Sequence, residues 1–285
     1  KVEINENHIK KANIIFNELR MQISELIKEN NRDKILITVC GGSGVGKSEI
    51  ASLLAYYFNK NEIGTYTLSG DNYPHCIPKY NDAERLRIFR ESGIKGMVKE
   101  DILTSERLET ILAYQIAGDD ANPNHKTKYP WYESYLDNGR KGLENYLGSF
   151  EEIGFNEIEH IINQYKKSEN PIWLRRMGRK DTELWYDKVD FSNIQILIIE
   201  WTHGNSDNYQ GVDIPILLNS TPEETLAHRQ ARNRDGETDS PFTTMVLEIE
   251  QSMLAVHAHK AKIIISKSGE LLSLDEYRSI MEINY

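Results

Sequence analysis

The stretch of this sequence with the clearest chemical potential is Gly41-Gly42-Ser43-Gly44-Val45-Gly46-Lys47-Ser48. It matches the pattern G-x-x-x-x-G-K-[ST], whose glycines let backbone N–H groups point inward around a chain of phosphates. An apolar run at 35–40 precedes it and a helical pattern follows, so we expect a buried strand, a glycine loop and a helix. The helix start adds the positive end of its dipole at the same place. The segment therefore predicts a nucleoside triphosphate site.

Two side chains in this loop have defined roles in such a site. Lys47 would reach the β- and γ-phosphates as a compact positive charge, and the Ser48 hydroxyl would ligate Mg²⁺. ATP and Mg²⁺ are therefore the expected cofactors. The residues expected to contact the nucleotide are Gly42, Ser43, Gly44, Val45, Gly46, Lys47, Ser48 and Glu49.

Two acidic residues come at the ends of predicted strands. Asp71 follows a short strand at 65–69, and Glu200 ends a mostly apolar strand at 194–200. In open α/β sheets ligands lie at the carboxyl ends of the strands, which places both acids near the glycine loop. Asp71 would accept the proton of a substrate hydroxyl or hold a Mg²⁺-bound water, although Asp-Asn also favours a simple turn. Glu200 would orient Mg²⁺ or its water.

A group of arginines follows a predicted helix start at Thr221. Arg229, Arg232 and Arg234 lie close together in this helix and at its end. Arginines brought over an ATP site can neutralise charge on the transferring phosphoryl group. The alternative is a plain basic helix end, because cations favour helix C-termini.

Weaker candidates lie elsewhere in the chain. Arg175 and Arg176 belong to a dense basic cluster that would bind an anionic substrate or simply lie on the surface. His203 could contact substrate, although a lone histidine is more often structural. Asp119 and Asp120 resemble a metal pair in spacing alone, and adjacent carboxylates in a loop are more often solvated.

Composition narrows the class of protein. The 285 residues are 39% hydrophobic, enough for a sizeable core, and carry a formal charge of −10. That charge argues against a nucleic-acid partner held mainly by phosphate attraction. Two cysteines indicate no disulfide framework, and no run of 18 apolar residues suggests a membrane segment. We expect a cytoplasmic protein that acts on a small molecule and is compatible with a homo-oligomer.

The predicted elements describe one α/β domain over 1–285. An amphipathic helix at 8–29 should pack beside the sheet, and further strands are expected at 214–219 and 262–266. Between about 95 and 185 no convincing strand is found, which predicts a mostly helical insertion on the substrate side. Just before it, Arg85, Arg87 and Arg90 are typical of a solvated helix face. The fold class expected is the three-layer α/β/α sandwich of P-loop NTPases, with a mostly parallel sheet.

Taken together, these motifs resemble the uridine kinase and phosphoribulokinase family of P-loop small-molecule kinases, which also looks related to bacterial pantothenate kinase. The points of resemblance are the loop at 41–48, Asp71-Asn72-Tyr73, the strand that ends in Glu200, the segment 228–235, and Tyr186-Asp187. The resemblance implies that Asp71 is the base, that Glu200 serves the metal and that the arginine segment forms a lid over ATP. It also implies that Tyr186 and Asp187 touch the acceptor, and it adds Tyr73 as a substrate candidate.

The sequence departs from this family in two ways. The family usually has Glu-Gly at the strand end, where this chain has Glu200-Trp201. The interval from Asp71 to Glu200 looks longer than in a uridine kinase, and the acceptor site is built largely there. The hypothesis is an ATP-dependent kinase of a hydroxyl on a nucleoside or sugar-like metabolite. The alternatives are an adenylylsulfate kinase, or another kinase of a phosphorylated acceptor, and a nucleotide-binding regulatory protein.

Overall fold

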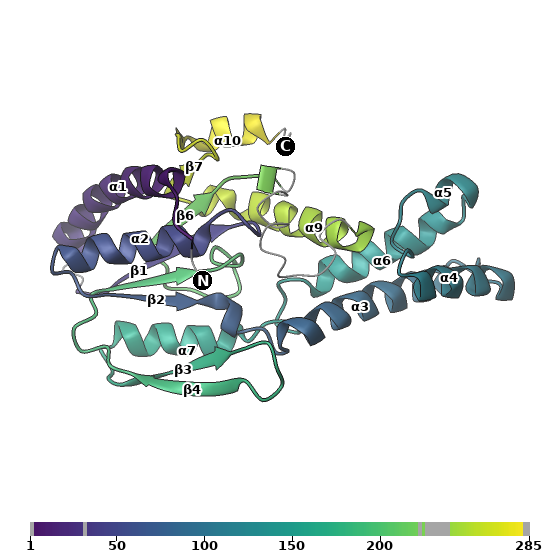
Figure 1. Ribbon diagram of the computed structural model, residues 1–285, viewed down its shortest axis with the longest axis horizontal. Coiled ribbons are helices and arrows are strands. Elements are labelled where there is room, and N and C mark those ends of the chain that lie inside the picture. Colours follow the sequence, from purple (N-terminus) through teal and green to yellow (C-terminus); the bar gives the residue numbers. More distant parts are fainter. Residues whose placement is uncertain (1–2, 31–32, 222–223, 226–239, 282–285) are drawn as a thin grey trace.

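The computed structural model describes residues 3–30, 33–221, 224–225 and 240–281, which form a mostly parallel sheet with helices on both faces (Figure 1). Five neighbouring strands of this sheet run parallel, and the last strand pairs antiparallel with its neighbour. The strands in sheet order are β2 (Thr65–Ser69), β5 (Ile196–Glu200), β1 (Ile35–Gly41), β6 (Ile214–Leu218), β7 (Ile263–Ile265) and β8 (Leu271–Leu272).

Each face of the sheet is covered by helices. On one face, alternate residues of β1 such as Ile35 and Ile37 pack in one core with α1 (Glu6–Asn30) and α2 (Lys47–Lys60). The intervening residues, Leu36 among them, face the opposite core. That core is covered by α7 (Phe155–Lys166), α9 (Pro241–His257) and α10 (Leu274–Ile280). The predicted three-layer α/β/α fold is therefore confirmed. In the described ranges, no helix has the length and apolar character needed to cross a membrane.

Four helices extend away from the sheet as an arm (Figure 1). They are α3 (Pro78–Lys99), α4 (Ser105–Ala117), α5 (His125–Lys128) and α6 (Tyr132–Tyr146). Helices α3 and α6 approach closely because glycines face aromatic rings. A Cβ at Gly93 would lie 2.6 Å from the Tyr135 ring, and one at Gly139 would lie 2.6 Å from the Phe89 ring. Larger side chains at these glycines would separate the two helices.

The sequence predicts no strand between about 95 and 185, but the structure has strands near the end of this range. Strand β3 (Ile172–Met177) pairs antiparallel with β4 (Leu184–Val189), and the two form a separate sheet. Ile172 and Leu174 are buried against α7, whereas Trp173 between them is exposed. Two arginines follow Leu174 in β3, so the apolar alternation is too short to identify the strand from sequence.

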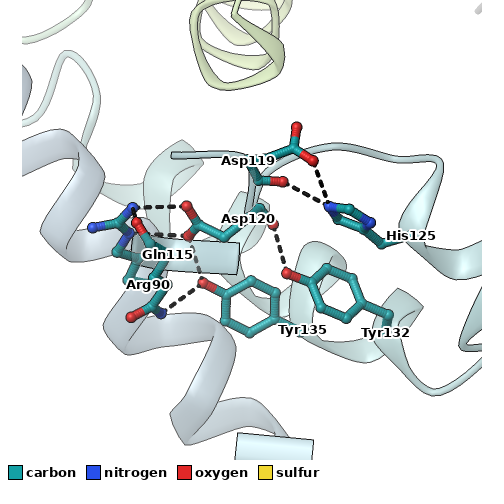
Figure 2. Close-up of polar contacts among 7 residues, drawn as sticks. All are labelled: Arg90, Gln115, Asp119, Asp120, His125, Tyr132 and Tyr135. Carbon is teal, nitrogen blue, oxygen red and sulfur yellow. Dashed lines mark hydrogen bonds and ion pairs between the residues drawn. The ribbon is translucent and has the colours of Figure 1, made fainter. Parts of the chain in front are cut away.

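The acidic pair at 119–120 is also not the solvated pair that the sequence suggests (Figure 2). Asp120 is 2% exposed and accepts two hydrogen bonds from Arg90, from Nε at 2.9 Å and Nη2 at 2.7 Å. The Tyr135 hydroxyl donates to the same carboxylate, and the Tyr132 hydroxyl donates to the Asp120 carbonyl. Asp119 is half-exposed and contacts His125. Arg90 and Asp120 therefore hold the arm together, and Arg90 does not belong to a solvated face.

Replacing Asp120 should weaken the arm. Asp120→Asn keeps the shape of the side chain but leaves the partly buried Arg90 guanidinium without its carboxylate, so we expect a loss of about 2 kcal/mol in the free energy of unfolding. Asp119→Asn is the matched control, because its half-exposed side chain should cost less than about 1 kcal/mol. Urea denaturation measures both. Equal losses in the two variants would contradict a structural role for the Arg90–Asp120 pair.

Candidate active site

The glycine loop between β1 and α2 has the backbone conformation that the motif predicts. Gly44 and Gly46 have φ angles of 78° and 97°, a region that L side chains rarely adopt. A Cβ at Gly46 would also lie 3.0 Å from Nε2 of His8, which α1 places against the loop. Because α2 begins at Lys47, its first backbone N–H groups lie in the loop. Such a loop fits a chain of phosphates.

Three functional side chains converge beside this loop. The Lys47 ammonium donates a hydrogen bond to the Gly42 carbonyl at 2.9 Å, so it folds back over the loop. The Ser48 hydroxyl donates to Oε2 of Glu200 at 3.0 Å. Strands β1 and β5 are neighbours in register, with Val39 paired to Glu200, which brings the end of β5 next to the loop. A hydroxyl and a carboxylate in contact are oxygen ligands of the kind that Mg²⁺ prefers.

The charges at this edge of the sheet affect one another. Burial raises the pKa of Glu200, and the negative charge of Asp71 raises it further. A hydrogen bond from Ser69 and the positive charge of Lys47 act in the opposite direction. Asp71 lies in the short 3₁₀ helix η1 (Gly70–Asn72) that follows β2 and is exposed to solvent. The two acids from β2 and β5 therefore lie at the same edge as the glycine loop, as predicted.

Trp201, which follows Glu200 where a glycine was expected from the resemblance, has a packing role. Trp201 is 2% exposed and its ring packs against Phe155. A Cβ at Gly70 would lie 2.0 Å from the Trp201 ring, so the backbone of η1 rests directly on the indole. The departure from Glu-Gly therefore fixes the backbone that carries Asp71.

A cavity opens beside Asp71, between the glycine loop and the start of the arm. Its volume is about 340 Å³, and helices α3 and α9 form much of its wall; we call it the α3–α9 cavity. The polar side chains that line it are Ser43, Asp71, Asn81, Asp82, Arg85, Thr243 and Glu250. This cavity is large enough for a small metabolite, and the glycine loop and Asp71 both reach it.

Two cavity residues have roles that sequence analysis missed or misjudged. Arg85 was expected on a solvated face, but its Nε donates to Oε1 of the buried Glu152 at 2.6 Å. Glu250 is not among the site residues that the sequence predicts. It lies four residues from Val246 and from Leu254, both buried, and an acid on the apolar stripe of a helix is the signal that could have identified it.

Several substrate candidates lie elsewhere. Tyr73 is fully buried in the core and is not among the residues that line the α3–α9 cavity. His203 is 9% exposed, and burial lowers its pKa to about 4, so its ring is neutral. This environment agrees with the structural alternative for a lone histidine.

The candidates on the small sheet contact one another. Arg175 on β3 and Tyr186 on β4 both approach Glu157, at 3.7 Å and 2.9 Å. Arg176 donates to Oδ2 of Asp187 at 2.8 Å and to the Tyr66 hydroxyl at 2.5 Å. None of these candidates lines the α3–α9 cavity, and both arginines already contact an acid.

Arg229, Arg232 and Arg234 lie outside the described residues. On the described side of this segment, the Glu224 N–H donates to the Thr221 hydroxyl at 3.2 Å, and the Thr221 N–H donates to the Glu224 carboxylate at 3.0 Å. These two bonds form a capping box at the predicted helix start. After the segment, the Ser240 hydroxyl accepts from the Thr243 N–H and caps α9.

Comparisons with known proteins relate these features to kinases. No family model matches the chain. The sequence is 36% identical over 242 residues to the bifunctional α-galactosidase/sucrose kinase AgaSK of Mediterraneibacter gnavus, a match that covers 85% of this chain and 21% of that protein. It is also 29% identical over 85 residues to the adenylyl-sulfate kinase of Prochlorococcus marinus, which covers 29% of this chain and 42% of the relative. The chain thus spans about a fifth of the length of the first relative and about two fifths of the length of the second.

The solved structure of D-glycerate 3-kinase from Cryptococcus neoformans var. grubii shares the fold. The TM-score is 0.51 at 10% identity, and the match covers 92% of this chain and 97% of that one. At this identity the likeness concerns the fold alone. The predicted resemblance is therefore confirmed: in sequence and in fold, this chain is similar to P-loop small-molecule kinases.

Proposed function

We propose that this chain is an ATP-dependent kinase that transfers the γ-phosphoryl group to a hydroxyl of a neutral, sugar-like small molecule. The observation that carries the proposal is the position of Asp71, which lies beside the phosphate loop and lines the α3–α9 cavity. An acceptor in this cavity would place a hydroxyl between the Asp71 carboxylate and the phosphates. Phosphoryl transfer depends on such positioning and on charge neutralisation more than on covalent chemistry.

The residues around Asp71 have different roles in this proposal. The glycine loop and the Lys47 ammonium hold the phosphates, and the Asp71 carboxylate orients the acceptor hydroxyl and accepts its proton. Ser48 and Glu200 would hold Mg²⁺, which neutralises charge on the β- and γ-phosphate oxygens. Arg229, Arg232 and Arg234 remain proposed as a lid that adds positive charge over the nucleotide.

The charges of the cavity favour a neutral acceptor over a phosphorylated one. Among the described residues that line it, Arg85 is the only cation, whereas Asp71, Asp82 and Glu250 are carboxylates. The arginines that could have received an anionic acceptor, Arg175 and Arg176, contact acids on α7 and β4 instead. The sucrose kinase activity in the name of the relative from Mediterraneibacter gnavus supports a sugar rather than a nucleoside.

Acceptor-dependent release of ADP tests the proposal. With ATP and Mg²⁺, sucrose and other neutral sugars should increase ADP release above the rate without acceptor, whereas adenylylsulfate and D-glycerate should not. Lys47→Ala is the blank, because it removes the charge that binds the phosphates. Greater stimulation by adenylylsulfate would favour a kinase of phosphorylated acceptors. ATP consumption that no acceptor changes would instead favour a nucleotide-binding regulatory protein.

The role of Asp71 is tested by the amide variant. Asp71→Asn should lower kcat at least about 100-fold, because a neutral amide cannot accept the hydroxyl proton. Binding of ATP, measured by calorimetry with a non-hydrolysable analogue, should change little. Asp137→Asn, an exposed carboxylate on α6, is the control and should leave both quantities unchanged. Normal turnover in Asp71→Asn would reject this role.

The proposed metal ligands predict a change in Mg²⁺ requirement. Ser48→Ala and Glu200→Gln should each raise the Mg²⁺ concentration for half-maximal rate by about 10-fold or more, since each removes an oxygen from the metal site. Ser52→Ala is one helical turn further along α2, where its hydroxyl bonds to the Ser48 carbonyl, and it should have no such effect. An unchanged Mg²⁺ dependence in both variants would place the metal elsewhere.

A further inference from the structure

We propose that Asn81, Arg85 and Glu250 form a subsite that hydrogen-bonds the non-reacting hydroxyls of a neutral polyhydroxylated acceptor, with Glu250 excluding anionic acceptors. This inference rests on the proposed function and adds the residues that select the acceptor. The three side chains come from two helices, α3 and α9, and all line the α3–α9 cavity. Asn81 and Arg85 lie on the arm, and Glu250 on α9 faces both them and the glycine loop, since it also lines a small pocket with Gly42 and Ser43.

Asn81 supplies a hydrogen-bond acceptor that has no partner in the part of the chain that the structure describes. The residue is 6% exposed, and its Nδ2 donates to Oε1 of Glu152 at 3.0 Å, which fixes the orientation of the amide. The Oδ1 atom on the other side is buried with no hydrogen-bond partner among the described residues. Buried polar atoms are rarely left in this state. Because Asn81 lines the α3–α9 cavity, a ligand there that donates a hydrogen bond would satisfy this atom.

Arg85 supplies donors at the same wall. Its Nε is used by Glu152 at 2.6 Å. The remaining nitrogens are further from acids, with Nη2 at 3.8 Å from Glu250 and Nη1 at 3.9 Å from Asp82. These distances exceed those of hydrogen bonds, so the terminal N–H groups can donate to a ligand oxygen while the guanidinium stays in place.

Glu250 supplies a carboxylate whose side chain is 12% exposed. Burial raises its pKa, the Arg85 charge opposes this, and the charges of Glu152 and Asp71 raise it further. In its ionised form, which the charges of Arg85 and Lys47 favour, Glu250 accepts hydrogen bonds from hydroxyls and repels a phosphate or a carboxylate ligand. The single guanidinium is already flanked by Glu152 and Glu250, so little positive charge is left for an anion.

The hydrogen-bond donors and acceptors of Asn81, Arg85 and Glu250 together match those of neighbouring hydroxyls on a sugar. Each hydroxyl donates one hydrogen bond and accepts others, so it can donate to Asn81 or Glu250 and accept from Arg85. A site that pairs buried polar groups with substrate hydroxyls rejects ligands that leave those groups unpaired. The subsite therefore selects for a neutral polyol and leaves one further hydroxyl for Asp71.

Steady-state kinetics of Glu250→Gln test the subsite. The variant should raise KM for sucrose about 10-fold or more, change KM for ATP less than about 2-fold, and reduce the preference for sucrose over glucose 6-phosphate. Glu248→Gln is the matched control on the same helix, because this residue is half-exposed and pairs with Arg140 outside the cavity. Asn81→Ala should also raise KM for sucrose, with a thermal melt to show that it is folded.

The results separate the subsite from the proposed function. An unchanged KM for sucrose in Glu250→Gln, or equal increases in KM for sucrose and for ATP, would overturn the subsite while the kinase activity stands. If no acceptor supports turnover, calorimetry measures sugar binding directly. With a non-hydrolysable ATP analogue present, the wild-type chain should bind sucrose, glucose or fructose. Glu250→Gln should bind that sugar at least about 10-fold more weakly. Binding of none of the three sugars, or equal binding by the variant, would also overturn the subsite.

Discussion

The parallel pairing of β2, β5 and β1 is the constraint on which the rest of the site depends. Because these strands are neighbours and end at the same edge, the glycine loop after β1, Glu200 at the end of β5 and Asp71 after β2 are brought together. The hydrogen bond from Ser48 to Glu200 joins the first two of these elements directly. A shift in the register of β5 would separate the acid from the hydroxyl and would also move Trp201, on which the backbone before Asp71 rests.

Buried ion pairs hold the arm in place and are a second requirement for the site. Arg85 contacts Glu152 at the base of α3, and Arg90 contacts Asp120 further along the same helix. Breaking a buried pair leaves an uncompensated charge, so these contacts hold α3 in one position relative to the loops that follow it. Since α3 forms a wall of the α3–α9 cavity, the same ion pairs determine the shape of the proposed acceptor site.

Local patterns carried most of what the sequence could predict. The glycine loop is one contiguous motif, and the predicted strands of the main sheet are short runs of apolar or strand-forming residues, so these elements could be located without knowledge of the tertiary structure. The order of the strands then placed Asp71 and Glu200 at one edge by a general rule of α/β sheets. The helix start at Thr221 depends only on neighbouring residues and was predicted for the same reason.

The remaining features depend on contacts between distant parts of the chain. Glu250 and Arg85 are far apart in sequence and meet only because α9 packs beside the arm, so neither could be assigned to the cavity from its neighbours. Asp120, in the turn after α4, looked solvated because its partner, Arg90, lies 30 residues earlier on α3. Strand β3 was missed because its arginines interrupt the apolar pattern, and their pairing with acids on α7 and β4 follows from the tertiary fold.

The central claim is that a phosphoryl group moves from ATP to a hydroxyl in the α3–α9 cavity. The most direct measurement follows the label of ATP carrying ³²P at the γ-position, in the presence of Mg²⁺ and a neutral sugar such as sucrose. The account predicts that the label appears in a phosphorylated sugar and that the Asp71→Asn variant forms almost none of it. Label that appears only as inorganic phosphate, with every sugar and with adenylylsulfate, would contradict the account.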